Sequence, residues 1–170
     1  MKKIKTLEKF PIWMILVSNL VSILTYVIGA YIMYKFGVAF LVFYLLYCLF
    51  MEYNVLRRSC VNCYYYGKLC GFGKGVICKL FFKIGNKKAF LNKKISMWDL
   101  VPDFLVTLIP FAFGVILLFK NFSWIILFLS LSLIFIAFFG NYAVRGFIAC
   151  RYCKQREIGC PAEKMFNRKK

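Results

Sequence analysis

Four long apolar blocks, almost free of charge, constrain the fold of this chain more than any other feature of its sequence. They cover residues 11–34, 37–51, 97–119 and 122–144. About 20 apolar residues in a helix cross the hydrocarbon core of a bilayer. Hydrophobic residues make up 62% of the chain, against about 45–50% in soluble domains, so lipid is expected to cover the excess. The sequence predicts an all-α membrane protein with four transmembrane helices.

Short polar interruptions divide these blocks into two pairs. Lys35-Phe36-Gly37 separates the first block from the second, and Lys120-Asn121 separates the third from the fourth. The second block is short for a span unless the aromatic residues that flank it sit at the membrane interface, where such rings are enriched. Turns this short predict tight helical hairpins. We therefore expect two tandem transmembrane hairpins, residues 11–53 and 97–144, each followed by a cysteine-rich segment.

The distribution of basic residues predicts how the hairpins are oriented. Residues 1–10 carry four Lys or Arg, residues 54–96 carry ten and residues 145–170 carry eight, whereas the two hairpin turns carry one each. Loops rich in Lys and Arg stay on the cytoplasmic side of a membrane. We expect a multi-pass protein of the cell membrane with both termini and the central segment in the cytoplasm.

The net charge also bears on the partners of the chain. It contains 24 Lys and Arg against six acidic residues, which gives a formal charge of +18. Such a balance suits the phosphates of nucleic acid or the anionic headgroups beside membrane spans. Because the basic residues flank apolar blocks, we expect a bilayer with anionic headgroups as the partner and no nucleic acid. A homo-oligomer or a partner in a membrane complex remains open.

Two cysteine triplets with the same spacing indicate an internal repeat. Each has the pattern C-x2-C-x6-C, each follows a predicted hairpin, and the second is displaced from the first by 90 residues. The triplets are Cys60, Cys63 and Cys70, and Cys150, Cys153 and Cys160. Two copies of one unit with parallel topology would be related by an axis along the membrane normal. Chance spacing is the alternative.

The cysteines outside the spans form a candidate metal site. A C-x2-C turn lets two thiolates converge on one tetrahedral ion, and two such pairs make a common structural zinc site. The candidate ligands are Cys60, Cys63, Cys70, Cys78, Cys150, Cys153 and Cys160. One arrangement joins the pair at 60 and 63 to the pair at 150 and 153. A second uses the four cysteines from 60 to 78 as a local site, and Glu163 is then a further ligand for the second triplet.

Other thiol chemistries stay open at this point. An iron–sulfur cluster also takes four cysteines, and Cys160-Pro161 matches the end of bacterial ferredoxin motifs, although the x6 interval fits neither ferredoxin spacing. Disulfides belong to oxidising compartments and to hyperthermophiles, and free or redox-active thiols are the third alternative. Cys48, inside the second apolar block, is expected to be a buried small hydrophobe.

The residue inventory narrows the function classes. The chain has no histidine, which excludes Ser–His triads and removes the usual general base at neutral pH. No catalytic residue can be assigned, and the leading hypothesis is a scaffold or complex subunit whose zinc holds a cytoplasmic cap together. The alternatives are a thiol or iron–sulfur redox protein, and a metal-ion transporter or delivery protein that passes ions through Glu52 or Asp103.

Smaller features add further expectations. Residues 64–66, three tyrosines, are expected to anchor at the headgroup level, and residues 76–95 are expected to lie on the membrane as an amphipathic segment. The glycines of residues 71–75 predict a turn, because they do not fit the spacing of a phosphate-binding loop. Pro110 is expected to kink the third span beside Gly114, where either a cavity or a packed contact would follow.

Overall fold

The computed structural model describes residues 6–86, 98 and 100–160. Within these residues no strand forms, and an isolated parallel bridge joins Leu7 to Cys153. The all-α class that the sequence predicts is therefore confirmed. The chain divides into two compact units, each considered by itself. The helical unit contains residues 20–52, 98 and 100–142, and the thiol unit contains residues 6–19, 53–86 and 143–160.

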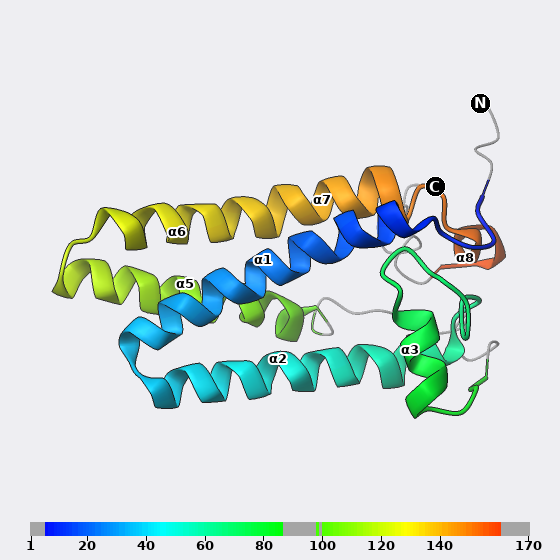
Figure 1. Ribbon diagram of the computed structural model, residues 1–170, viewed down its shortest axis with the longest axis horizontal. Helices are drawn as coiled ribbons and strands as arrows, with labels where there is room; N and C mark the ends of the chain where they lie inside the picture. Colours follow the sequence, from blue (N-terminus) through cyan, green and yellow to red (C-terminus); the bar gives the residue numbers. More distant parts are fainter. Residues whose placement is uncertain (1–5, 87–97, 99, 161–170) are drawn as a thin grey trace. The chain divides into compact units, whose positions relative to one another are not determined.

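Four helices are long and apolar enough to cross a membrane (Figure 1). They are α1 (Ile12–Phe36), α2 (Val38–Arg58), α5 (Val101–Lys120) and a fourth that begins as α6 (Trp124–Phe135). The fourth continues through a π-helical turn, Ile136–Gly140, then α7 (Asn141–Ala143) and a second π-helical turn, Val144–Ala149. Large apolar side chains point outward, with Phe43 and Phe128 each 72% exposed, as in helices that face lipid.

These helices extend beyond the apolar blocks that predicted them. α2 reaches Arg58, past the expected end at Met51, and the fourth helix reaches Ala149 rather than Val144. Hydropathy marks the part of a helix that can lie in lipid, whereas the helix itself ends where its backbone hydrogen bonds end. With 21 residues, α2 is long enough to span although its apolar block is short.

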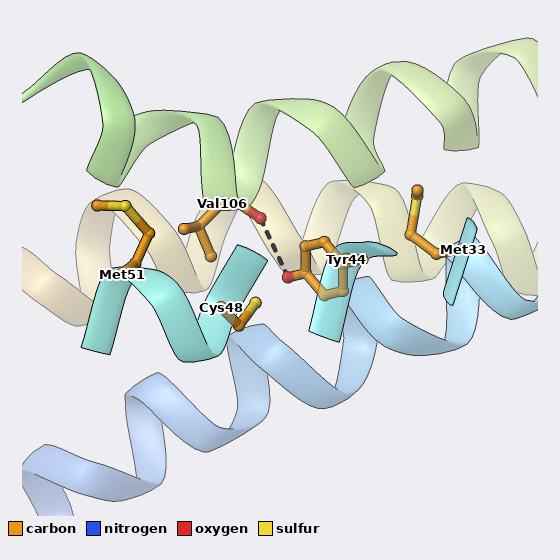
Figure 2. Packing of buried hydrophobic residues seen from close by; sticks show 5 residues of the cluster. All are labelled: Met33, Tyr44, Cys48, Met51 and Val106. Carbon is orange, nitrogen blue, oxygen red and sulfur yellow. Dashed lines mark hydrogen bonds between the residues drawn. The ribbon is translucent and has the colours of Figure 1, made fainter. Parts of the chain in front are cut away.

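The core of the helical unit is a cluster of five buried residues from three helices (Figure 2). Met33 comes from α1, Tyr44, Cys48 and Met51 come from α2, and Val106 comes from α5. Cys48 is only 6% exposed. The expectation that this cysteine is a buried small hydrophobe is confirmed.

Pro110 lies in the interior of α5, which continues from Val101 to Lys120. Because proline has no N–H, the carbonyl of Val106 loses its usual intrahelical donor. The hydroxyl of Tyr44 donates to that carbonyl at 3.1 Å (Figure 2). Gly29 of α1 makes room for this tyrosine, since a Cβ there would collide with the Tyr44 hydroxyl. A side chain from α2 thus compensates for a proline in α5.

Gly114 of α5 allows a close contact with α6. A Cβ at this position would collide with Oγ of Ser130, and it would lie 3.5 Å from Cγ2 of Ile32 in α1. Small residues are common where membrane helices approach closely. Of the two outcomes expected beside Pro110, the packed contact is the one that the structure shows.

The acidic residues near the ends of the spans have defined positions. Glu52 of α2 accepts a hydrogen bond from the hydroxyl of Tyr26 in α1, with 2.7 Å between the oxygens. Asp103 lies in the first turn of α5, where a negative charge favours the helix N-terminus. Asp99 lies outside the described residues. The hydrogen bond of Glu52 gives that carboxylate a structural role.

Candidate metal centre

Both cysteine triplets and Cys78 belong to the thiol unit. All eight cysteines of the chain are free thiols, and Cys48 alone belongs to the helical unit. The chain segments that carry the triplets are 90 residues apart in sequence. Folding therefore gathers all seven candidate ligands into one compact part of the molecule.

The two C-x2-C segments fold in the same way. In the first cysteine turn, residues 60–66, the amide of Cys63 donates to the carbonyl of Cys60 at 3.3 Å. In the second cysteine turn, residues 150–156, Cys153 donates to Cys150 at the same distance. In each turn the carbonyl of the second cysteine, Cys63 or Cys153, also accepts a hydrogen bond of 3.1 Å from the amide three residues later. The second cysteine of each turn has extended backbone geometry.

Neighbouring backbone amides lower the pKa of the second cysteine in each turn. Those of Tyr64 and Tyr65 act on Cys63, and those of Gln155 and Arg156 act on Cys153. Burial nevertheless dominates, raising the pKa of the Cys63 thiol and raising that of Cys153 to about 12. Both thiols therefore hold their protons at neutral pH, while the amides are already placed to stabilise a thiolate.

The two cysteine turns exchange hydrogen bonds with each other. The amide of Tyr64 donates to Oε1 of Gln155 at 2.7 Å, and the amide of Lys154 donates to the hydroxyl of Tyr65 at 2.9 Å. Tyr64 and Lys154 each follow the second cysteine of their turn and lie 90 residues apart, and so do Tyr65 and Gln155 at the next position. In each turn, the amide of the residue after the second cysteine is the donor. The acceptor is the side chain that lies two residues after the second cysteine of the other turn. This exchange is the arrangement expected for two copies related by a two-fold axis.

Tyr65 and Gln155 are both buried, at 2% and 5% exposure. The Tyr65 hydroxyl also donates to the carbonyl of Leu7 at 2.5 Å, and Nε2 of Gln155 donates to the carbonyl of Gly159 at 2.9 Å. The expectation that this tyrosine anchors at the headgroup level is therefore wrong, because its hydroxyl is used inside the thiol unit. Both residues lie two positions after the second cysteine of a C-x2-C pair, and this shared position was the sequence signal that could have identified them.

Helix α3 (Lys74–Phe81) brings Cys78 to the first cysteine turn. The helix packs against residues Cys60–Asn62, and Cys78 is fully buried, with its sulfur 3.7 Å from the carbonyl of Leu56. Burial and the neighbouring Cys70 raise the pKa of the Cys78 thiol. Docking of one short helix thus brings Cys78 to the first cysteine turn.

Glycines in residues 67–75 permit this docking. Gly73 precedes α3 with a left-handed backbone conformation, φ 70°, which glycine adopts without strain. A Cβ at Gly75 would collide with the carbonyl oxygen of Tyr65, and one at Gly71 would lie 2.9 Å from Cβ of Ala149. The carbonyl of Phe72 accepts a hydrogen bond from Nδ2 of Asn19 in α1 at 3.2 Å. The glycines therefore serve close packing, in agreement with the turn that the sequence predicts.

The predicted amphipathic segment is helical over α3, and residues 87–95 lie outside the described part. One face of α3 turns Gly75 and Cys78 inward, while Leu80 and Phe81 are 77% and 74% exposed. An exposed apolar face on a short helix with lysines nearby suits the membrane interface. Its placement on a membrane stays a prediction.

The N-terminal segment has a larger structural role than its basic composition suggested. The amide of Leu7 donates to the carbonyl of Tyr152 at 2.9 Å, and the amide of Phe10 donates to that of Leu69 at 3.0 Å. The ring of Phe10 packs edge-on against Tyr65, with 5.6 Å between centroids. Residues 7–10 therefore contact the segments that carry both triplets. Nothing in the cysteine spacing indicated this.

Cys63 and Cys153 each interact electrostatically with thiols of both triplets. The thiols of Cys70 and Cys160 lie close enough to raise the pKa of Cys63 beyond the effect of burial, and Cys63 has the same effect on Cys153. Cys60 interacts electrostatically with Cys63, Cys70 and Cys78. The thiols of the two triplets therefore influence one another electrostatically within the thiol unit.

Among the described residues, no group of three or more Cys, Asp or Glu side chains already has the spacing needed to hold a metal ion. Glu163 and Pro161 lie outside those residues. Comparisons with protein-family models, with curated proteins and with solved structures found no match to this chain. The chemistry of the site is therefore argued from its own residues.

Proposed function

We propose that this chain is a multi-pass membrane protein in which cysteine thiolates on the cytoplasmic face bind structural zinc, and that it serves as a scaffold or a subunit of a membrane complex. One observation carries the proposal. Two cysteine turns of matching geometry are joined by an exchange of hydrogen bonds, and backbone amides beside the second cysteine of each turn lower the pKa of its thiol. Amides in this position favour the thiolates that a tetrahedral zinc ion requires.

The orientation follows from the charges beside the spans. Two tandem hairpins, residues 11–53 and 97–144, would leave the cysteine-rich segments 54–96 and 145–170 on one side of the membrane. Of the 24 basic residues, the two hairpin turns hold one each, and the positive-inside rule assigns the remainder to the cytoplasm. The lipid partner is then the anionic inner leaflet.

Protonated thiols support a structural metal more than a redox couple. A redox-active C-x2-C pair needs an accessible thiolate with a lowered pKa, whereas burial raises the pKa of Cys63 and of Cys153. Zinc replaces such protons on binding and converts buried thiols into ligands. An iron–sulfur cluster uses the same ligand type, and the spectrum of the purified protein distinguishes it from zinc.

The test is elemental analysis and an absorption spectrum of the full chain purified in detergent without oxygen. We expect zinc at a fixed ratio to protein, with no visible absorption. A Cys48→Ser variant should keep the metal because Cys48 lies in the core of the helical unit, whereas Cys153→Ser should lose part of it. Broad visible absorption would indicate an iron–sulfur cluster. Seven freely titrating thiols without metal would overturn the proposal.

A further inference from the structure

We propose that residues 69–82 form a re-entrant element, which enters the leaflet beside the thiol unit and leaves it on the same side. The tip of its loop, at Phe72, lies at the boundary between headgroups and acyl chains, and the exposed face of α3 contacts anionic phospholipid. An amphipathic segment on the membrane surface differs from this element, because here the loop before the helix is inserted as well. The inference does not depend on metal binding.

The loop before α3 lies beside the first turns of α1. Nδ2 of Asn19 donates to the carbonyl of Phe72 at 3.2 Å and to that of Ile15 at 2.8 Å. A Cβ at Gly73 would lie 3.2 Å from Cγ2 of Ile15, so the loop tip is level with residues 15–19. At about 1.5 Å per residue, these residues lie roughly 5–10 Å along α1 from its first residue, Ile12. The loop therefore extends past the start of the span.

The end of the fourth span lies against the same loop. A Cβ at Gly71 would lie 2.9 Å from Cβ of Ala149, and the guanidinium carbon of Arg145 lies 6.0 Å from the centroid of the Phe72 ring. Arg145 is the first charged residue after the apolar block that ends at position 144. Basic side chains near the ends of spans extend to the headgroups. Both spans therefore place Phe72 at the boundary of the hydrocarbon.

The backbone of the loop is paired within the protein, as irregular backbone at membrane depth requires. The carbonyl of Leu69 accepts from the amide of Phe10 at 3.0 Å, and the amide of Gly73 donates to the carbonyl of Cys70 at 2.9 Å. The side chain of Asn19 provides the donor to Phe72 between these two bonds. A loop in water would not need a donor from a membrane span.

Helix α3 leaves one apolar face uncovered. Val76 and Ile77 are 38% and 46% exposed, and Leu80 and Phe81, one turn later, are 77% and 74% exposed. Residues four apart share one face of a helix, so these four side chains form a continuous apolar surface. The opposite face, with Cys78, is buried against the thiol unit. Lipid is the ordinary cover for such a surface on a short helix beside membrane spans.

Contacts with the end of α2 hold α3 at the level of the interface. The ring of Phe82, directly after α3, packs against Tyr53 with 5.5 Å between centroids. Tyr53 follows the second apolar block, is 47% exposed, and has the position of an interfacial aromatic residue. The sulfur of Cys78 lies 3.7 Å from the carbonyl of Leu56, one turn further along α2. The apolar face of α3 thus continues the lipid-facing surface of α2.

The charges of the segment select the type of lipid. Residues 69–82 contain Lys74 and Lys79 and no acidic residue, and Lys83 follows directly. Lysines beside an apolar face at this level attract the phosphates of anionic headgroups. Anionic phospholipid supplies both partners that the segment needs, since its acyl chains and its charged headgroups meet at one boundary.

The experiment is fluorescence quenching of the full chain in vesicles of phosphatidylcholine and phosphatidylglycerol with bromine on the acyl chains. Phenylalanine replaces the native tryptophans, which are Trp13, Trp98 and Trp124. Single tryptophans are then introduced as Phe72→Trp and Phe81→Trp. We expect bromine near the headgroup end of the chains to quench both strongly, and bromine near the chain ends to quench them weakly.

Two further tryptophans calibrate the measurement. Phe128→Trp, at a 72% exposed position of α6, should be quenched because it faces lipid within a span. Ile158→Trp should keep its fluorescence, although position 158 is 49% exposed. It ends α8 (Lys154–Ile158), directly after Arg156 and Glu157, and charged neighbours keep such a position in water.

The outcomes separate this inference from the proposed function. Quenching of Phe81→Trp without Phe72→Trp would leave α3 on the membrane surface and overturn the re-entrant loop. An unquenched Phe81→Trp, beside a quenched Phe128→Trp, would overturn lipid as the partner of α3 and leave water or another protein on that face. The Phe81 variant tests the inference even where the one at Phe72 does not fold. Its metal content should equal that of wild type, because the Phe81 side chain is exposed.

Discussion

At the scale of single residues, the junction between the cysteine turns depends on two different side chains that do the same work. Tyr65 and Gln155 occupy equivalent positions, and each presents an oxygen to a backbone amide of the other turn. A buried amide without an acceptor costs about 1–3 kcal/mol. An oxygen acceptor at this position matters more than the type of side chain that carries it, which explains how a tyrosine and a glutamine can correspond.

Removing one of these acceptors should loosen the thiol unit. In Tyr65→Phe the ring remains, but the amide of Lys154 and the carbonyl of Leu7 lose their partner. We expect a loss of about 1–3 kcal/mol in the free energy of unfolding, measured by thermal or denaturant unfolding in detergent. Tyr34→Phe, at an exposed tyrosine of α1, is the control. Equal stability of the two variants would argue against the hydrogen-bond exchange.

The protonated thiols predict a pH dependence for protein prepared without metal. Burial raises the pKa of Cys153 from an ordinary value near 9 to about 12. The folded state then binds this proton more tightly than the unfolded state, so the stabilising contribution is complete below pH 9 and is lost as pH rises toward 12.

The measurement is the free energy of unfolding of the metal-depleted chain between neutral pH and pH 11. We expect wild type to lose more stability over this range than Cys153→Ser, which has no thiol proton to lose at this position. Identical slopes would mean that Cys153 is not buried as the structure has it.

At the scale of elements, helices approach their neighbours closely at glycine residues. Helix α3 meets the first cysteine turn and the loop that follows it at Gly75, and α5 meets α6 at Gly114. In the second case the neighbour is the Ser130 side chain, which can rotate, whereas in the first it is a backbone carbonyl, which cannot move without the loop. Docking of α3 should therefore be the less tolerant of the two contacts.

Gly75→Ala should displace α3 and with it Cys78. Because the new Cβ would collide with the carbonyl of Tyr65, we expect a destabilisation of about 1–3 kcal/mol, typical of overpacking, together with weaker metal binding. Gly146→Ala is the matched control, since nothing lies within 4 Å of a Cβ there and alanine is the better helix former. Unfolding curves and metal titrations of both variants provide the comparison. Unchanged metal binding in Gly75→Ala would exclude α3 from the site.

At the scale of the whole molecule, the positions of the basic residues predict which side of the membrane carries the thiols. Moving a segment rich in lysine and arginine across hydrocarbon is costly, and residues 54–96 and 145–170 hold 18 of these residues between them. Both cysteine triplets are then expected on the same side, where a shared metal centre can form. A topology that separated them would be incompatible with the junction at Tyr65 and Gln155.

Labelling in cells tests this topology. We compare two single-cysteine variants in which the other cysteines are replaced, one that keeps the exposed Cys150 and one that carries Asn121→Cys in the turn after α5. A membrane-impermeant thiol reagent should label the turn in intact cells, and position 150 only after permeabilisation. Labelling of Cys150 from outside would refute the cytoplasmic placement of the thiol unit.

The sequence by itself determined the elements of this protein. Apolar length defined four spans, because a helix in lipid must bury its backbone within itself and needs little from its neighbours. Local spacing likewise identified the two C-x2-C segments, which form turns with matching hydrogen bonds. The helix ends predicted from hydropathy were less accurate. Helix α2 continues to Arg58, although the hydropathy of the sequence falls before that residue.

Only the tertiary structure decided which groups meet. The acceptor of the Tyr64 amide lies 91 residues away in Gln155, and the donor to the carbonyl freed by Pro110 comes from Tyr44 on another helix. Contacts of this kind depend on where distant segments fold together, and hydropathy or residue spacing carries no such information. For the same reason the sequence left two zinc arrangements open, while packing placed both cysteine triplets in one compact unit.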